Sequence, residues 1–193
     1  PLVSAETETI TVDEAAALVV AALVASGVSQ ENAESVARAL VRAEVDGQGG
    51  HGLSRVAAYA AQAASGKVDG KARPLVEKSR PALLSVDARH GFAFPAVDAA
   101  WEMLVPLVRE AGLAGAAFRR SHHAGQLGAH VERLAEAGLV ALMVANTPKA
   151  MAPWGGAGPL YGTNPIAFAA PRTGAPLVID LSLSHVARGK VMA

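Results

Sequence analysis

Apolar residues recur at helical spacing through the first third of the chain. Thr11 and Glu14 stand three residues apart, which is the spacing of a capping box, so we expect a helix to begin there. Ser29 can cap a second helix, and the next periodic segment predicts a third over residues 53–65. The pattern therefore predicts a helical N-terminal unit over residues 1–74.

Short apolar runs replace the long helical periodicity after residue 75, which is typical of an α/β unit. Pro106 lies inside the longest helical segment and should kink or break it. Residues 146–165 form a long segment rich in Gly and Pro, and loops of this length are usually functional or disordered. We expect strands at residues 81–86, 115–118, 139–145, 166–169 and 177–179, and helices at residues 95–110 and 126–137. The sequence thus predicts an α/β unit over residues 75–193.

The composition narrows the class of protein. The 193 residues carry 17 Lys+Arg against 17 Asp+Glu, so no excess of positive charge favours nucleic-acid binding. A hydrophobic fraction of 51% excludes intrinsic disorder and is ample for a packed core. The chain has no Cys, which excludes disulfides, thiolate catalysis and cysteine-ligated zinc.

The chain also lacks the usual membrane and export signals. No apolar stretch approaches the roughly 20 residues that a membrane-spanning helix needs. Its first residues show neither the basic region nor the cleavage site of a signal peptide. We therefore expect a cytoplasmic protein that binds neither a membrane nor nucleic acid.

His51 lies in a glycine-rich segment between two predicted helices. An imidazole titrates near neutral pH, so it can donate or accept a proton in catalysis. Arg55 follows four residues later, where a guanidinium on the next helical turn could clamp a carboxylate. Spacing alone favours a simpler interpretation, a capping or surface histidine beside a solvated arginine.

A polar turn, residues 121–125, separates a predicted strand from a predicted helix. The free N–H groups of a helix N-terminus suit a phosphate or carboxylate, although a histidine cap explains the turn equally well. We expect a side chain at Gly125 to narrow the approach of a cofactor. The adjacent His122 and His123 point in different directions, and the sequence has no H-E-x-x-H motif, so we expect no metal site.

Common nucleotide-binding and hydrolase motifs are absent from the sequence. There is no G-x-G-x-x-G after a strand, no phosphate-binding loop of the G-x-x-x-x-G-K-[ST] type and no G-x-S-x-G. Asp180 ends a predicted strand, a common position for a ligand-binding carboxylate and equally for a turn-forming one. These features indicate an α/β enzyme but do not identify a reaction.

The motifs resemble the malate/L-lactate/sulfolactate dehydrogenase family of NAD(P)-dependent 2-hydroxyacid oxidoreductases, which lack a Rossmann fold. The resemblance is strongest to the sulfolactate dehydrogenase branch. It implies a sulfolactate-dehydrogenase-like α/β fold, with the helical unit beside a cofactor-binding unit. The matching stretches follow the family's order over nearly the whole chain, at residues 46–55 with Tyr59, 121–125, 146–156, 162–171 and 178–190.

The resemblance implies a role for each matched residue. His51 matches the general acid/base, Arg55 the arginine that binds the substrate carboxylate, and Thr163 a threonine near the substrate. His123 is expected to face both substrate and nicotinamide. The remaining expected cofactor-binding residues are Ser121, His122, Ala124, Gly125, Ile179, Asp180 and Leu181. The implied partners are NAD or NADP, a small 2-oxo or 2-hydroxy acid, and a second copy of the chain in a homodimer.

Two features depart from the family pattern. Gly50 stands where the family usually has Ser immediately before its catalytic histidine, and family members are nearly twice as long. Two alternatives therefore stay open beside a 2-hydroxyacid dehydrogenase. One is a cyclic imino-acid reductase of the same family, and the other is a truncated, non-catalytic homologue.

Overall fold

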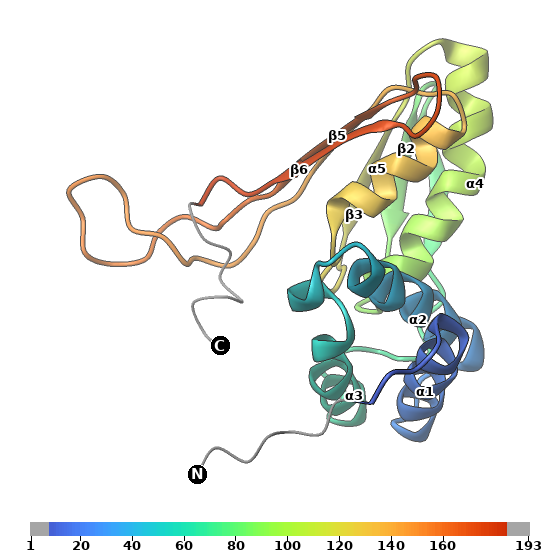
Figure 1. Ribbon diagram of the computed structural model, residues 1–193. Helices are drawn as coiled ribbons and strands as arrows, with labels where there is room; N and C mark the ends of the chain where they lie inside the picture. The colour runs from blue at the N-terminus through green and yellow to red at the C-terminus, as the bar shows by residue number, and fades with distance from the viewer. Residues whose placement is uncertain (1–7, 185–193) are drawn as a thin grey trace.

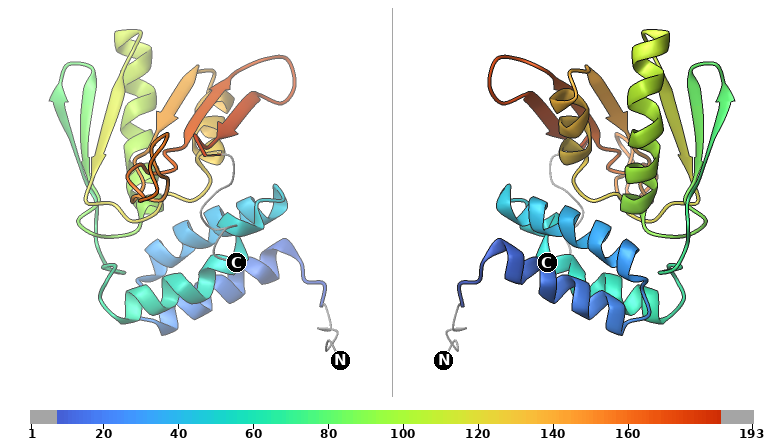
Figure 2. Two further views of the ribbon diagram at one scale, coloured as in Figure 1. Left: turned by 90° about the vertical axis from the view of Figure 1, so that its left-hand side faces the viewer. Right: turned by 90° about the vertical axis from the view of Figure 1, so that its right-hand side faces the viewer.

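The computed structural model describes residues 8–184 and shows a mixed α/β chain with two three-stranded sheets (Figure 1). Figure 2 shows the three N-terminal helices as a layer across one end of the sheets. The helices are α1 (Val12–Ala25), α2 (Gln30–Val45), α3 (Val56–Ala64), α4 (Ala93–Ala111) and α5 (Leu127–Glu136). The strands are β1 (Leu75–Arg80), β2 (Leu83–Asp87), β3 (Gly115–Arg119), β4 (Ala141–Val144), β5 (Ile166–Ala170) and β6 (Leu177–Leu181).

The expected caps open the first two helices. The Thr11 hydroxyl accepts from the Glu14 amide at 3.2 Å, and the Glu14 carboxylate accepts from the Thr11 amide at 2.8 Å. The Ser29 hydroxyl accepts from the Asn32 amide at 3.4 Å at the start of α2. These contacts confirm the capping box and the second cap.

The first sheet has the order β1-β2-β3, with an antiparallel β1–β2 pair and a parallel β2–β3 pair. Helix α4 connects the two parallel strands, as a parallel pair requires. The sequence pattern did not predict β1, whose side chains are almost all exposed. Its strand conformation comes from pairing with β2.

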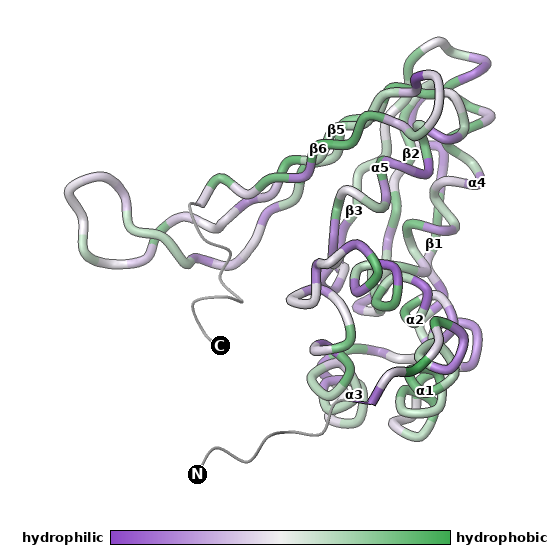
Figure 3. The backbone as a smooth tube through the Cα atoms, viewed as in Figure 1, coloured by the Kyte–Doolittle hydropathy of each residue, from purple (hydrophilic) through white to green (hydrophobic). Residues whose placement is uncertain are grey.

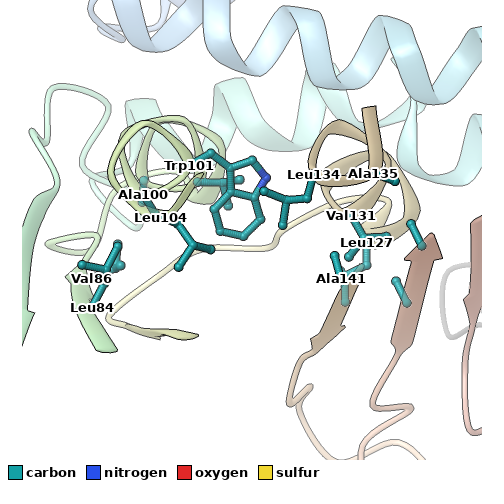
Figure 4. Close-up of a cluster of buried hydrophobic side chains, with 14 of the residues drawn as sticks. Leu84, Val86, Ala100, Trp101, Leu104, Leu127, Val131, Leu134, Ala135 and Ala141 are labelled. Atoms are coloured by element: carbon teal, nitrogen blue, oxygen red, sulfur yellow. The ribbon is translucent and has the colours of Figure 1, made fainter. Parts of the chain in front are cut away.

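Helix α4 runs unbroken through Pro106, so the expected break is absent. Proline removes the hydrogen bond to the carbonyl four residues earlier, here that of Glu102. Both Pro106 and Glu102 are exposed, so water can solvate that carbonyl. On the opposite side of the helix, Trp101 is buried between α4 and α5 and donates to the carbonyl of His130 at 3.0 Å (Figure 4).

The second sheet has the order β4-β5-β6 and is entirely antiparallel. One face packs on α5 through small buried residues such as Ala141, Ala167 and Ala169. Along the other face, Leu142, Phe168 and Ile179 pair in one row across the three strands. Leu142 is 69% exposed and Ile179 is 44% exposed, so the strand expected at residues 139–145 is present as β4 but is buried on one face only. Figure 3 shows the apolar character of β5 and β6.

Two hydrophobic clusters form the core. One lies among the sheets, α4 and α5, and the other joins the N-terminal helices. The helical cluster also contains Phe92 and Phe94, which follow β2 in the chain. Arg42 of α2 forms an ion pair with Glu132 of α5 at 2.7 Å, which further fixes the helices against the sheets. Because Phe92 and Phe94 pack with the N-terminal helices, the helical cluster extends past residue 74, and the domain boundary there stays a prediction.

Within residues 8–184, no helix combines the length and the apolar character that a membrane crossing requires.

Candidate functional site

Two short 3-10 turns, Gly49–His51 and Leu53–Arg55, hold His51 between α2 and α3. The carboxylate of Glu44 accepts from the Leu53 amide at 2.8 Å and closes this segment. Gly52 packs directly on Glu44, where a Cβ at position 52 would collide with the carboxylate and lie 3.1 Å from the Glu44 nitrogen. The turn that presents His51 therefore requires Gly52.

Arg55 lies on the same turn as His51, as the spacing suggested. Its Nε donates to the carbonyl of Gly50 at 2.6 Å, which fixes the guanidinium beside the histidine segment. Among the described residues, the terminal Nη groups of Arg55 make no hydrogen bond or ion pair. A planar guanidinium with free Nη donors can bind a carboxylate.

The turn between β3 and α5 brings two histidines onto α3. The Tyr59 hydroxyl lies 2.7 Å from Nδ1 of His123, and the Gln62 side-chain oxygen lies 2.6 Å from Nε2 of His122. The backbone amide of His122 donates to the Gly91 carbonyl at 3.1 Å. Helix α3 therefore fixes both imidazoles of the turn.

The rings of His51 and His123 stack, with centroids 5.4 Å apart and an interplanar angle of 15°. This contact joins two residues that are far apart in sequence and that both belong to the predicted site. Desolvation, followed by repulsion from the positive charge of Arg55, lowers the pKa of His51. The structure thus brings His51, His123 and Arg55 together as one cluster.

Desolvation also acts on the two turn histidines, although His122 is only half-buried and His123 keeps much of its surface exposed. Desolvation, followed by repulsion from Lys67, lowers the pKa of His122 to about 4. The pKa of His123 is lowered as well. The largest cause is desolvation of the ring by the protein around it, and repulsion from His51 and Arg55 follows. Both rings are therefore neutral near neutral pH.

The side chain of Asp180 lies at the N-terminus of α5, which the sequence analysis considered as a site for a phosphate or carboxylate. Its carboxylate accepts from the Gly128 amide of α5 at 2.6 Å. It is the last residue but one of β6 and pairs with Ala167. Its negative charge also acts on His51, whose pKa it tends to raise. The anion at this end of α5 is thus a side chain of the protein itself.

Gly125 is buried and has a φ of +66°. A Cβ there would lie 3.1 Å from the ring of Phe94, so a side chain would press into the helical cluster. The backbone conformation itself also favours glycine. Gly125 is therefore required by packing and conformation, which differs from the expected clearance for a cofactor.

The other predicted site residues lie apart from the histidine cluster. Ile179 and Leu181 are 44% and 46% exposed, and they alternate with Asp180 on the strand, so they lie on the opposite face of the sheet. Thr163 belongs to the long segment before β5, where its hydroxyl lies 3.2 Å from that of Thr147. Among the described residues, no hydrogen bond or ring contact joins Thr163 to His51. The matched stretch at residues 185–190 lies outside the described residues.

Ser121 and Ala124 complete the turn. The hydroxyl of Ser121 donates to the His122 carbonyl at 3.0 Å, and the Ala124 carbonyl lies 2.8 Å from Nε2 of His130. Sequence reasoning missed His130, which is 4% exposed and ties the turn to α5. It also missed Gln62. Residue type alone could not identify Gln62, because its partner His122 lies 60 positions away in the sequence.

Within the part of the chain that the structure describes, no group of three or more His, Asp or Glu side chains is arranged to hold a metal ion.

Comparisons with known proteins identify the family. The family model described as malate/L-lactate dehydrogenase matches residues 10–193. A (2R)-3-sulfolactate dehydrogenase (NADP(+)) from Chromohalobacter salexigens is 59% identical over 184 residues, which cover 95% of this chain and 55% of that protein. A Delta(1)-pyrroline-2-carboxylate/Delta(1)-piperideine-2-carboxylate reductase from Pseudomonas syringae pv. tomato is 47% identical over 169 residues, 87% of this chain and 49% of that protein.

Solved structures share the fold. The delta1-piperideine-2-carboxylate reductase from Pseudomonas syringae pv. tomato superposes with a TM-score of 0.92 at 44% identity, covering 96% of this chain and 56% of that one. The sulfolactate dehydrogenase from Methanocaldococcus jannaschii gives a TM-score of 0.87 at 27% identity, covering 95% and 53%. The chain spans about half the length of the relatives it matches. The family match over nearly the whole chain and the shared fold show that this protein belongs to the malate/L-lactate dehydrogenase family.

Proposed function

We propose that the chain carries the acid/base part of an NADP- or NAD-dependent oxidoreductase that interconverts a 2-hydroxy acid and its 2-oxo acid. The substrate would be of the sulfolactate, malate or lactate type. The observation that carries the proposal is the cluster of His51, His123 and Arg55, which groups a proton-transfer group with a carboxylate-binding group. The 59% identity with an enzyme named for sulfolactate and NADP(+) supports both substrate class and cofactor.

The described residues fit the reacting end of such a cofactor. Nδ1 of His51 is buried without a hydrogen-bond partner in this part of the chain, an unsatisfied polar group of the kind common at functional sites. His51, His122 and His123 would line the nicotinamide and substrate side. The N-terminus of α5 does not fit a phosphate, because Asp180 already accepts from its Gly128 amide. When bound, the reduced nicotinamide would supply a hydride to the carbonyl carbon.

Each residue of the cluster then has a chemical task. Arg55 binds the substrate carboxylate through its free Nη groups and so orients the carbonyl. His51 gives a proton to the carbonyl oxygen during reduction, and takes it back from the alcohol during oxidation. Because desolvation and Arg55 favour neutral His51, the site favours the proton-accepting form, which is the one that alcohol oxidation needs.

The experiment is a comparison of turnover in purified His51→Ala and unaltered protein, with NADPH or NADH and sulfopyruvate, oxaloacetate or pyruvate. We expect His51→Ala to reduce turnover by about 100-fold or more, the usual loss for a positioned proton-transfer group. Unchanged turnover would exclude His51 as the acid/base. Failure of the unaltered chain to bind or oxidise either cofactor would favour the alternative of a non-catalytic homologue.

A second candidate is reduction of a cyclic imino acid. The 47% identical relative is named for Delta(1)-pyrroline-2-carboxylate and Delta(1)-piperideine-2-carboxylate, and its structure gives a TM-score of 0.92. Such substrates also carry the carboxylate that Arg55 would bind. Turnover of Delta(1)-pyrroline-2-carboxylate and sulfopyruvate by the same preparation separates the two candidates.

A cytoplasmic location and a homodimeric state belong to the same proposal. The absence of Cys suits a reducing compartment. The apolar row of Leu142, Phe168 and Ile179, in which Leu142 and Ile179 are exposed and Phe168 is half-buried, suits burial against another chain. Light scattering coupled to size exclusion tests the dimer, and a monomer at all concentrations would reject it.

A further inference from the structure

The hydroxyl of Tyr59 makes a single hydrogen bond within the described residues, to Nδ1 of His123 at 2.7 Å. Tyr59 is 3% exposed and its ring packs against those of Phe92 and Phe94. Burial raises the pKa of this phenol, so it keeps its proton throughout the physiological range. The contact therefore joins a rigid, protonated phenol to one defined nitrogen of a site histidine.

The direction of this hydrogen bond follows from counting donors. A phenol has one O–H, and a neutral imidazole has one N–H and one bare nitrogen. If Nδ1 of His123 carried the proton, the Tyr59 O–H would have no acceptor among the described residues. An unsatisfied buried donor is costly, so Tyr59 donates and Nδ1 accepts. Neutral His123 then carries its proton on Nε2.

The neighbouring rings leave this Nε2–H available. The ring of His51 stacks on that of His123 at 15°, and nearly parallel rings do not form an in-plane hydrogen bond with each other. The ring of His122 is held separately by Gln62. Within residues 8–184, the side chain of His123 makes its hydrogen bond through Nδ1, and Nε2 has no hydrogen-bond partner. The Nε2–H of His123 is therefore a free hydrogen-bond donor beside His51, the proposed acid/base.

We propose that Tyr59 is a positioning residue that locks His123 in the Nε2–H tautomer, so that His123 presents a fixed hydrogen-bond donor next to His51. The donor would bind an oxygen of the oxo-acid substrate while His51 transfers the proton. The role toward substrate rests on the proposed function. The tautomer does not, because it follows from contacts within the chain.

The test is a long-range proton–nitrogen correlation spectrum of the chain with isotope-labelled histidine, near neutral pH. Single His→Gln variants assign the resonances. We expect His123 to show a protonated Nε2 and a bare, hydrogen-bonded Nδ1. Tyr59→Phe removes only the hydroxyl and should give mixed tautomers, because the lost bond favours one form by roughly fivefold or more. Tyr161→Phe is the matched control, since Tyr161 is exposed and far along the chain in the long segment before β5; its spectrum should be unchanged.

Two results would overturn the proposal. One is an Nδ1–H tautomer of His123 in the unaltered protein, which needs no variant to be folded. The other is a folded Tyr59→Phe protein with an unchanged His123 tautomer. A turnover measurement separates this proposal from the proposed function. If the protein reduces no oxo acid but still shows the Tyr59-dependent Nε2–H form of His123, the proposed reaction is rejected and the positioning role of Tyr59 is retained.

Discussion

His51 and His123 stack with their ring centroids 5.4 Å apart, although 71 residues of chain separate them. A positive charge on His51 disfavours protonation of His123, and the charge of Arg55 lowers the pKa of both rings. Proton affinity in this cluster is thus a shared property. The charge of Arg55 therefore changes the proton affinity of both rings.

We predict that Arg55→Gln raises the pKa of His51, because a neutral side chain no longer repels the imidazolium. Arg55→Lys keeps the charge and should leave that pKa low. The same Lys variant should raise the Michaelis constant for the oxo acid about 10-fold or more, because an ammonium lacks the planar fork. Histidine titrations by magnetic resonance and steady-state kinetics check the two effects. Equal His51 titration in both variants would show that the charge of Arg55 is irrelevant.

Stability should fall in mildly acid solution. The pKa of His122 is about 4 in the folded protein, below its ordinary value of 6.5, so between these values the unfolded chain binds the extra proton. The stability contribution is therefore complete above about pH 6.5 and is lost as the pH falls toward 4, by at most about 1.4 kcal/mol per pH unit for this residue. Denaturation midpoints across this range provide the measurement. His122→Gln should flatten the curve, and an unaltered slope would contradict the assignment.

Gly50 and Gly52 provide a matched pair on the turn that holds His51. No heavy atom lies within 4 Å of a Cβ built at Gly50, whereas one at Gly52 collides with Glu44. We predict that Gly50→Ser is tolerated, while Gly52→Ser lowers the free energy of unfolding by about 1–3 kcal/mol. Thermal and denaturant unfolding compare the variants. Equal losses would mean that the turn rearranges freely.

Asp180 should stabilise α5 through its bond to the Gly128 amide. Asp180→Ala removes this cap and should cost about 1 kcal/mol of stability. Glu136→Gln, at the other end of the same helix, removes a carboxylate near the negative end of the dipole and should cost nothing. Denaturant unfolding of both variants distinguishes a cap from a general effect of charge. A similar loss in both would reject the capping role.

The sequence predicted local features of the fold well. Caps such as Thr11–Glu14 and helical periodicity depend on residues a few positions apart, and the expected helices were found. Strand β1 was missed because its exposed, charged sequence has no apolar pattern, and only β2 makes it a strand. The expected break at Pro106 is absent because this position faces solvent, where water can replace the lost backbone hydrogen bond.

The candidate site shows the same limit. His51, Arg55 and the turn histidines could be selected by residue type and family motif, and the structure brings His51, Arg55 and His123 together. The side chains that hydrogen-bond the two turn histidines, Tyr59 and Gln62, belong to helix α3. Their pairing depends on how α3 packs against the turn, which no local pattern encodes.

The row of Leu142, Phe168 and Ile179 also affects how the chain behaves in solution. An uncovered apolar face of this kind promotes self-association, and ions such as sulfate strengthen the tendency because they are excluded from protein surfaces. Association of folded chains raises the apparent melting temperature by mass action. We therefore expect the thermal stability of this protein to rise with protein concentration and with sulfate in the buffer.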